Sequence, residues 1–286
     1  MEKRIDLHIH TNCSDGVLSP KQVIDEAVRN NVFTISITDH DTINAYNDEL
    51  FNYAKSKGVS LIRGVEISTK ITKAGIHVLG YDIDVNNKEL IEALFMLRNS
   101  RHKYLHDVSS KLERLGYIIN TQELDKIDAV AKSHISANIV GNKENEKILM
   151  QNFGHIPNKG EFIETVMNEG CEAYVKKHTI TPKQAAELIR KAGGKVVLAH
   201  PVAYKYEDNL SDEDILNIVN DMEADGIEAN YIYITRDNKK VNESSKWNEF
   251  AKKNNLIVTT GSDFHIKDGI HPEIGLLDPK ENDIEK

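Results

Sequence analysis

The chain has 286 residues, enough for one large hydrophobic core or two modest ones. Hydrophobic residues make up 40% and charged residues 28%, a composition that excludes a disordered, collagen-like or fibrous protein. The formal charge of -9 argues against a general nucleic-acid binder with a basic face, so we do not expect duplex nucleic acid as a partner.

The sequence also carries information on location and on charge balance. No charged-then-apolar leader opens it, and no apolar run reaches the roughly 18 residues that span a bilayer. We therefore expect a cytoplasmic protein with no membrane partner, whereas oligomeric state leaves no mark on the sequence. An acidic chain that handles anionic substrates needs another source of positive charge, and bound divalent metals are the expected one.

Seven short β-rich runs occur along the chain, with helix-like segments between several of them. The runs are 5–10, 34–38, 60–66, 76–81, 195–199, 226–229 and 256–260. Ser19-Pro20 and Thr181-Pro182 each place a capping residue before a proline at the first helical position. Alternation of strand and helix predicts a parallel sheet, either open or closed into a barrel.

The stretch from 88 to 174 breaks this rhythm, because it contains helical patterns but little that is typical of strands. We expect it to be an inserted helical subdomain that caps the substrate site. The barrel domain would then comprise residues 1–87 and 175–286.

Potential metal ligands recur where the predicted strands end. His8 and His10 are separated by one residue on the first strand, so their side chains point the same way. Further candidates stand in the other strand segments: Asp39, His40, Asp41, Glu66, His77, His200, Asp263 and His265. Because the carboxyl ends of parallel barrel strands share one face, this distribution predicts a single site.

The chemistry of these residues favours a cluster of metals. Imidazole and carboxylate without cysteine suit Zn, Mn or Fe, and this many ligands are too many for one tetrahedral ion. We expect two or three divalent ions. The alternative is that each is a structural strand-end residue, but burying them together without a metal incurs large desolvation and repulsion costs.

Six segments resemble the PHP family, which is named for polymerase and histidinol phosphatase. They are DLHIHTNCSDG at 6–16, ITDHD at 37–41, GVEIS at 64–68, HVLGY at 77–81, LAHP at 198–201 and GSDFH at 261–265. The chain looks most similar to stand-alone members that act on nucleoside 3′,5′-bisphosphates and on the 5′ ends of short oligonucleotides. The resemblance implies a distorted (β/α)7 barrel with an inserted helical subdomain.

The resemblance also implies a ligand set. One metal would sit on His8, His10, Glu66 and Asp263, a second on Glu66, His77 and His200, and a third on Asp15, His40 and His265. By sequence alone Asp15 is a turn residue in Ser14-Asp15-Gly16.

The implied mechanism is hydrolysis of a phosphate ester by metal-activated water, attacking in line on phosphorus. The residues expected to act in catalysis are Asp15, His40, Glu66, His200 and His265. Asp39 and Asp41 flank His40, and either orient imidazoles or are solvated carboxylates at the strand end.

The insertion supplies candidate contacts to a small phosphorylated substrate. Nucleotide-acting relatives carry an arginine-bearing RPHIAR-like segment, and here His134 is retained while Lys132 and Ala137 replace the arginines. We expect Lys132, His134 and Arg101 to contact substrate. Lysine lacks the bidentate fork of arginine, so specificity for bisphosphates does not follow directly.

Three other functions remain alternatives: a phosphatase for a small metabolite such as histidinol phosphate, a non-catalytic metal-binding module, and an amidohydrolase. The long insertion argues against the first. The second predicts missing ligands, although every expected position is filled. The third would normally require a ligating lysine on a mid-barrel strand, and no ligand-bearing segment ends in one.

Overall fold

The computed structural model describes residues 4–127, 130–176, 179–235 and 237–275. These residues divide into two compact units, 1–95 with 179–286 and 96–178. We call them unit 1 and unit 2. The predicted division at residues 88 and 174, with its capping role for the insertion, stays a prediction. No helix in the described ranges is long and apolar enough to cross a membrane.

Unit 1 contains a seven-stranded sheet in the order β1-β2-β3-β4-β5-β6-β9. Its strands are β1 (Arg4–Ile9), β2 (Val32–Ile37), β3 (Ser60–Lys70), β4 (Gly75–Tyr81), β5 (Lys195–Leu198), β6 (Gly226–Asn230) and β9 (Ile257–Thr260). All seven predicted strands are present. A parallel bridge between Ile9 and Phe264, with the amide of His10 donating to the Phe264 carbonyl at 2.9 Å, joins the two edges into a distorted barrel.

One strand runs against the others. β4 pairs antiparallel with both β3 and β5, so the prediction of a parallel sheet is wrong at this strand. The link from Lys70 to Gly75 is a tight hairpin, and a parallel pair would need a crossover of a dozen or more residues. As a result the amino end of β4 lies at the same rim of the barrel as the carboxyl ends of its neighbours.

The inside of the barrel holds a small apolar cluster that supports the site. Leu79 and Tyr81 of β4 pack with Val197 of β5, and Leu7 of β1 packs against the same group. Since β1 is a neighbour of neither β4 nor β5 in the sheet, Leu7 reaches this cluster across the barrel interior. The Tyr81 hydroxyl also donates to the Leu7 carbonyl at 3.0 Å, which ties opposite walls together.

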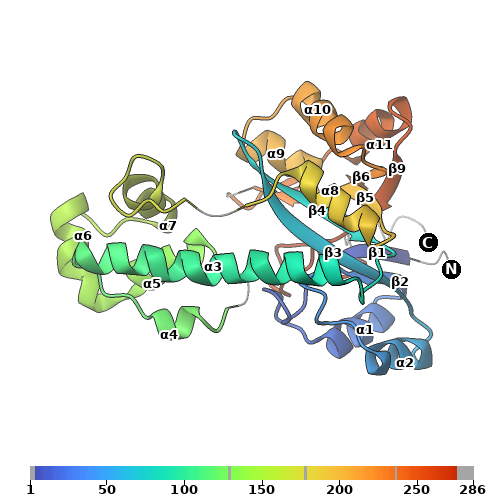
Figure 1. Cartoon of the computed structure of the whole chain (residues 1–286), viewed down its shortest axis with the longest axis horizontal. Helices are drawn as coiled ribbons and strands as arrows, with labels where there is room; N and C mark the ends of the chain where they lie inside the picture. Colours follow the sequence, from blue (N-terminus) through green and yellow to red (C-terminus); the bar gives the residue numbers. More distant parts are fainter. Residues whose placement is uncertain (1–3, 128–129, 177–178, 236, 276–286) are drawn as a thin grey trace. The chain divides into compact units, whose positions relative to one another are not determined.

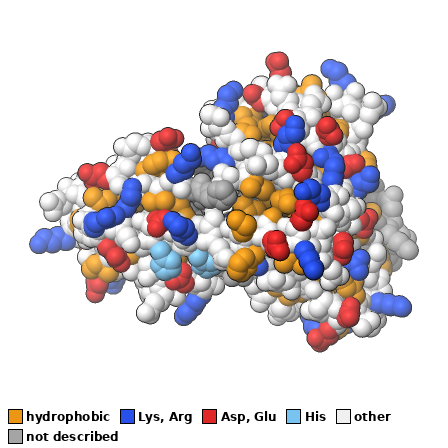
Figure 2. Space-filling model, in the orientation of Figure 1, with side chains coloured by type: hydrophobic (Ala, Val, Ile, Leu, Met, Phe, Trp, Pro, Cys, Tyr) orange, Lys and Arg blue, Asp and Glu red, His pale blue; other side chains and the backbone are white. Residues whose placement is uncertain are grey.

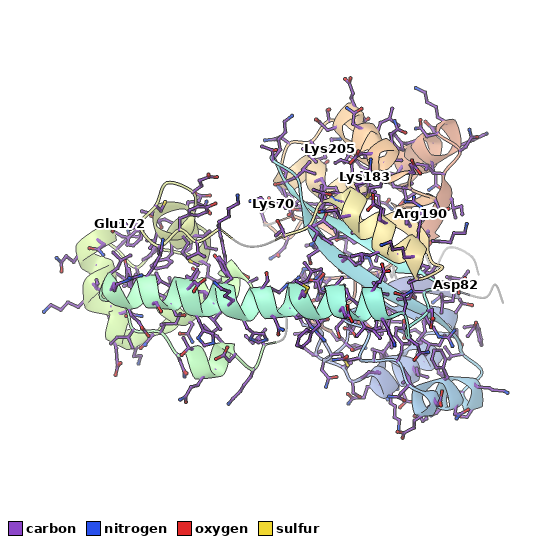
Figure 3. All side chains as sticks on the ribbon, viewed as in Figure 1. Lys70, Asp82, Glu172, Lys183, Arg190 and Lys205 are labelled. Atoms are coloured by element: carbon purple, nitrogen blue, oxygen red, sulfur yellow. The ribbon has the colours of Figure 1, made fainter. Side chains whose placement is uncertain are left out.

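Helices cover the outside of the barrel (Figure 1). They are α1 (Pro20–Arg29), α2 (Asp48–Ser56), α8 (Pro182–Lys191), α10 (Asp212–Met222) and α11 (Ser244–Lys253). The short helix α9 (Pro201–Glu207) lies instead at the barrel rim, where the Tyr204 hydroxyl accepts from the His77 amide at 2.8 Å. Both predicted caps are confirmed, because Ser19 and Thr181 each form a capping box ahead of a proline at the helix start. Arg190 of α8 donates to the carbonyls of Met222 and Glu223, which joins α8 to the end of α10 (Figure 3).

The described residues of unit 2 are helical and contain no strand. They hold the end of α3 (Lys88–Arg114), then α4 (Thr121–Leu124), α5 (Lys132–Gly141), α6 (Glu146–Phe153), α7 (Lys159–Phe162) and a π-helical turn, Ile163–Met167. Their core is separate from that of the barrel and includes Leu105, Tyr117, Ile135 and Phe162. The short antiparallel pair β7 (Ile232–Ile234) and β8 (Lys240–Asn242) belongs to unit 1.

Charged side chains of both signs are interspersed over the face drawn in Figure 2. Among the described residues drawn there, Lys and Arg side chains do not gather into the broad basic region that a general nucleic-acid binder presents.

Candidate metal centre

The structure brings all nine predicted ligands together at one rim of the barrel in unit 1. They are His8, His10, Asp15, His40, Glu66, His77, His200, Asp263 and His265, and their nitrogen and oxygen atoms form one connected network of short contacts. His8, His10 and Glu66 are completely buried. His77 reaches this rim from the amino end of β4, which is possible only because that strand is antiparallel.

Glu66 lies at the centre of the cluster. Five imidazole nitrogens approach within 3.4 Å of its two carboxylate oxygens, and they belong to His8, His10, His40, His77 and His200. The two oxygens face different neighbours: Oε2 faces His8, His10 and His40, whereas Oε1 faces His77 and His200. A carboxylate in this position has one oxygen for each of two cations.

Asp263 completes a four-residue group with His8, His10 and Glu66. Its Oδ1 lies 3.3 Å from His8 Nε2 and 3.1 Å from His10 Nε2. Those two Nε2 atoms are themselves 3.1 Å apart. Four potential ligand atoms therefore face one point, which is the arrangement that a tetrahedral ion requires.

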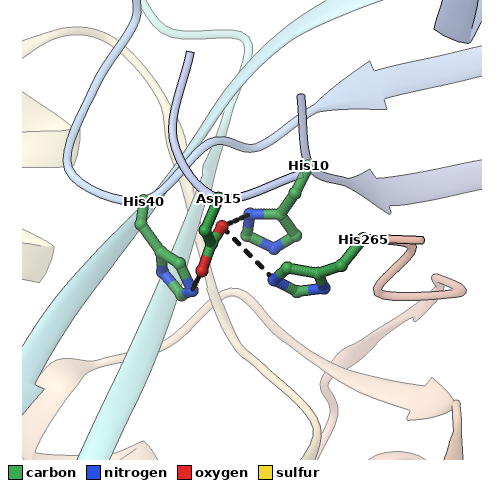
Figure 4. Close-up of side chains that lie close together, drawn as sticks. All are labelled: His10, Asp15, His40 and His265. Atoms are coloured by element: carbon green, nitrogen blue, oxygen red, sulfur yellow. Dashed lines mark ion pairs between the residues drawn. The ribbon is translucent and has the colours of Figure 1, made fainter. Parts of the chain in front are cut away.

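A second four-residue group comprises His10, Asp15, His40 and His265 (Figure 4). Asp15 Oδ1 lies 3.4 Å from His265 Nε2 and 3.6 Å from His10 Nδ1, and Oδ2 lies 3.7 Å from His40 Nε2. A third group contains His40, Glu66 and His77. His200 Nε2 lies 3.3 Å from both Glu66 Oε1 and His77 Nδ1, and those two atoms are 2.9 Å apart. The three residues that the resemblance assigns to the second metal therefore also lie close together, with His40 beside them on the other oxygen of Glu66.

The donor atoms of the cluster fit a metal by an independent criterion. Among the described residues, four buried atoms of the cluster have no hydrogen-bond partner: His10 Nδ1, His40 Nδ1, Glu66 Oε2 and His200 Nδ1. His40 Nδ1 and Glu66 Oε2 are only 2.9 Å apart, yet they do not form a hydrogen bond of acceptable geometry. Buried polar atoms are normally satisfied, so the facing pair His40 Nδ1 and Glu66 Oε2 points to a cation as the missing partner.

Glu228 is a functional residue that sequence reasoning missed. It lies on β6, is completely buried, and its two oxygens are 3.0 and 3.1 Å from His8 Nδ1. Its Oε2 also accepts from the His200 backbone amide at 2.9 Å. Donation from His8 Nδ1 leaves the Nε2 lone pair facing Asp263 and Glu66, which is how carboxylates orient histidine ligands. The available signal was a glutamate in an otherwise buried strand, Gly226–Asn230.

The backbone is specialised where it carries the cluster. Gly261 lies against Glu228 and His8, and a Cβ at this position would lie 2.1 Å from Glu228 Oε1. His200 and Asp263 have positive φ angles of 23° and 52°, which non-glycine residues rarely adopt. Such strain persists only where surrounding structure enforces it, and it concentrates at functional sites.

The charges within the cluster shift the pKa values of its members in opposite directions. Burial lowers the pKa of His8, but the negative charges of Glu228, Asp263 and Glu66 outweigh it and hold that pKa well above its usual value. Burial likewise opposes protonation of His10, whose carboxylate neighbours raise its pKa to about 10. Conversely, burial raises the pKa of Glu66, but the surrounding imidazoles hold it well below normal. In the metal-free state, protons therefore balance the carboxylates.

Asp39 and Asp41 are both buried, so neither is a solvated carboxylate. Asp39 accepts from the amide and hydroxyl of Thr11 and from the hydroxyl of Ser14, at 2.6–2.7 Å. These bonds hold the loop that carries Asp15. Asp41 accepts from the Ser68 amide at 2.8 Å and so ties the turn after β2 to β3.

The predicted substrate contacts lie in unit 2. Arg101 is buried on α3. Lys132 Nζ donates to Asn168 Oδ1 at 2.8 Å, and His134 Nδ1 accepts from the Ala131 amide at 3.1 Å, where it caps the start of α5. Their contact with substrate stays a prediction.

A cavity of about 430 Å³ opens beside the cluster. One wall consists of cluster residues, including Glu66, His77 and Asp263. The remaining lining residues include Tyr204, Glu207, Asp208, Tyr231 and Tyr233. The ligand cluster is therefore accessible to a small substrate.

Relatives and solved structures match nearly the whole chain. A 5′-3′ exoribonuclease of Haemophilus influenzae is 32% identical over 94% of this chain and 92% of its own length. A 3′,5′-nucleoside bisphosphate phosphatase of Chromobacterium violaceum is 25% identical over 91% of this chain and 87% of its own length. A solved Chromobacterium violaceum structure described as an amidohydrolase shares the fold, with a TM-score of 0.72 over 99% of this chain and 96% of that one, at 23% identity.

The family model described as PHP domain matches residues 6–164, more than half of the chain. The match includes β2, β3, most of β1 and the residues that follow these strands, and therefore His8, His10, His40 and Glu66. The chain therefore belongs to the PHP domain family of metal-dependent phosphoesterases.

Proposed function

We propose that this protein removes nucleotides from the 5′ ends of short oligoribonucleotides. The observation that carries the proposal is the complete set of nine ligands in a chain that is 32% identical to a 5′-3′ exoribonuclease over 92% of that enzyme. A second candidate, release of phosphate from nucleoside 3′,5′-bisphosphates, is supported by the 25% identical phosphatase.

The nine residues would hold two or three divalent ions. His8, His10, Glu66 and Asp263 would bind one ion, and His10, Asp15, His40 and His265 offer the donors for another. Glu66, with His77, His40 and His200 around it, would serve a third. Mn, Zn and Fe all accept these ligands, and we leave the choice among them to experiment.

Bound divalent ions would supply positive charge to offset the phosphate oxygens and would make water acidic enough to provide hydroxide near neutral pH. The protein's own part is orientation. Glu228 holds the His8 proton on Nδ1, and the Asp263 carbonyl, 2.8 Å from His265 Nδ1, does the same for His265. Both imidazoles thereby keep their Nε2 lone pairs directed into the cluster.

The other hypotheses are weaker on specific grounds. A non-catalytic module predicts lost ligands, yet all nine are retained. A histidinol-phosphate phosphatase has no support beyond family membership. The solved structure described as an amidohydrolase is 23% identical, so it bears on the fold and not on the reaction.

A substrate panel tests the proposal. With added Mn²⁺, we expect release of mononucleotides from a 5′-phosphorylated di- or trinucleotide to be faster than phosphate release from adenosine 3′,5′-bisphosphate, nucleoside monophosphates or histidinol phosphate. His8→Ala should abolish hydrolysis because it removes a buried ligand, and thermal unfolding would check that the variant folds. Preference for the bisphosphate would replace the leading candidate by the second, and full activity of His8→Ala would contradict the ligand set.

The second prediction concerns Glu228. In Glu228→Gln the amide oxygen can still accept from His8 Nδ1, but the amide nitrogen cannot accept from the His200 amide. We expect Mn²⁺ affinity, measured by titration calorimetry, to fall roughly tenfold to a hundredfold. Glu26→Gln is the matched control, because Glu26 is also mostly buried but is paired with Arg29. Wild-type affinity in Glu228→Gln would show that neither the charge of Glu228 nor its bond to the His200 amide supports metal binding.

The third prediction follows from the raised pKa of His10. In the metal-free protein, protonated His10 stabilises the folded state fully below its ordinary pKa of 6.5, and this contribution is lost as pH rises through about 10. Metal binding needs the neutral imidazole, so Mn²⁺ uptake near neutral pH should release protons, and apparent affinity should rise with pH over this range. Calorimetry in buffers of different ionisation enthalpy measures the release. Buffer-independent heats and a flat pH profile would contradict the assignment.

A further inference from the structure

A second cavity, of about 270 Å³, adjoins the one beside the ligand cluster. The two cavities share five lining residues: Glu207, Tyr231, Tyr233, Asp263 and His265. All residues of both cavities belong to unit 1. A substrate whose phosphate lies at the cluster can therefore extend directly into this side pocket.

The walls of the side pocket suit an uncharged group. Its lining includes four apolar side chains, those of Ile232 and Ile234 of β7 and those of Ile266 and Pro272. None of its described lining residues is a lysine or arginine, and Glu207 and Asp263 contribute negative charge. His271 also lines the pocket, and its Nδ1 lies 2.7 Å from the Asp268 carboxylate. A second phosphate is thus a poor occupant, whereas an apolar surface is well accommodated.

Two tyrosines make the pocket suitable for a flat ring. Tyr233 stacks on Tyr206 with ring centroids 5.7 Å apart and an interplanar angle of 27°, and its hydroxyl donates to Glu207 Oε1 at 3.0 Å. Its ring is therefore fixed in place. Tyr231 spans the junction between the cavities, with its hydroxyl 3.4 Å from Asp263 Oδ2 and its ring 5.5 Å from that of His200.

We propose that this side pocket binds the nucleobase of the nucleotide being cleaved. Nucleobases are planar and uncharged, and proteins hold unpaired bases by stacking on aromatic rings and by contact with apolar side chains. The polar lining residues Glu207 and His271 can pair with the edge of a base, which carries its own donors and acceptors. The inference rests on the proposed function, because it requires a nucleotide phosphate at the ligand cluster.

The test compares 5′-phosphorylated dinucleotides that carry a base at both positions with those that are abasic at the first or the second position. With the Mn²⁺-loaded protein, removal of the base that occupies the pocket should lower kcat/KM about fivefold to a hundredfold, which is the range for loss of one stacked base. Calorimetry supplies a readout besides activity: adenosine 5′-monophosphate should bind more tightly than ribose 5-phosphate by a factor in the same range.

Variants assign the effect to the pocket. Ile234→Ser and Tyr233→Leu should bring the ratio of kcat/KM for normal and abasic substrates toward one. Ile270→Ser is the matched control, because Ile270 is 39% exposed and lines neither cavity, and it should keep the wild-type ratio. Thermal unfolding of each variant checks that it folds. Tyr233→Phe keeps the aromatic ring, so it should keep the wild-type ratio of kcat/KM for normal and abasic substrates.

The outcomes separate this inference from the function on which it rests. One outcome would be equal kcat/KM for all three dinucleotides together with equal affinity for adenosine 5′-monophosphate and ribose 5-phosphate. That outcome would overturn the base pocket and leave the phosphoesterase function intact. Discrimination that survives in both pocket variants would overturn the assignment to this cavity. Cleavage of none of the dinucleotides would overturn the exonuclease proposal and this inference with it.

Discussion

The structure depends on the burial of one carboxylate, that of Glu66, among five imidazoles. Its two oxygens are fully shielded from solvent and lie within 3.4 Å of ring nitrogens on β1, β4 and the loops after β2 and β5. An uncompensated carboxylate in this position would carry a severe desolvation cost. Compensation must come from positive charge, supplied by protons in the metal-free state and by divalent ions when they are bound.

Irregular features of the barrel bring the imidazoles and carboxylates of the cluster together around Glu66. β4 runs antiparallel, which brings His77 to the rim from a strand start. The pairing register shifts in β1 beside His8 and in β6 after Glu228, and bulges of this kind redirect side chains next to active sites. Strained backbone at His200 and Asp263 completes the placement. A regular parallel barrel with the same residues would not bring these donors together.

Much of the fold follows from local sequence signals. Seven β-rich runs and two capped helices are visible because burial and capping leave patterns within ten residues or fewer. The orientation of β4 was predicted wrongly, since the antiparallel choice depends on a short link that the strand-helix rhythm obscures. His8 and His10 are evident from spacing. Asp15 is not, because Ser14-Asp15-Gly16 has the composition of an ordinary turn, and its place beside His265 depends on loop contacts to Asp39.

Glu228 is a second residue whose role depends on a contact that is distant in sequence. A single glutamate in a buried strand indicates that another buried polar group contacts it, but it does not identify that group. The contacting residue, His8, lies 220 residues away. The orientation of His8 thus depends on a long-range contact that no local sequence pattern reveals. Metal content measured by mass spectrometry after Mn²⁺ loading and dialysis tests this account most directly. We expect two or three ions per wild-type chain and at most one in Glu66→Ala. Equal metal content in the two proteins would contradict the central role of Glu66.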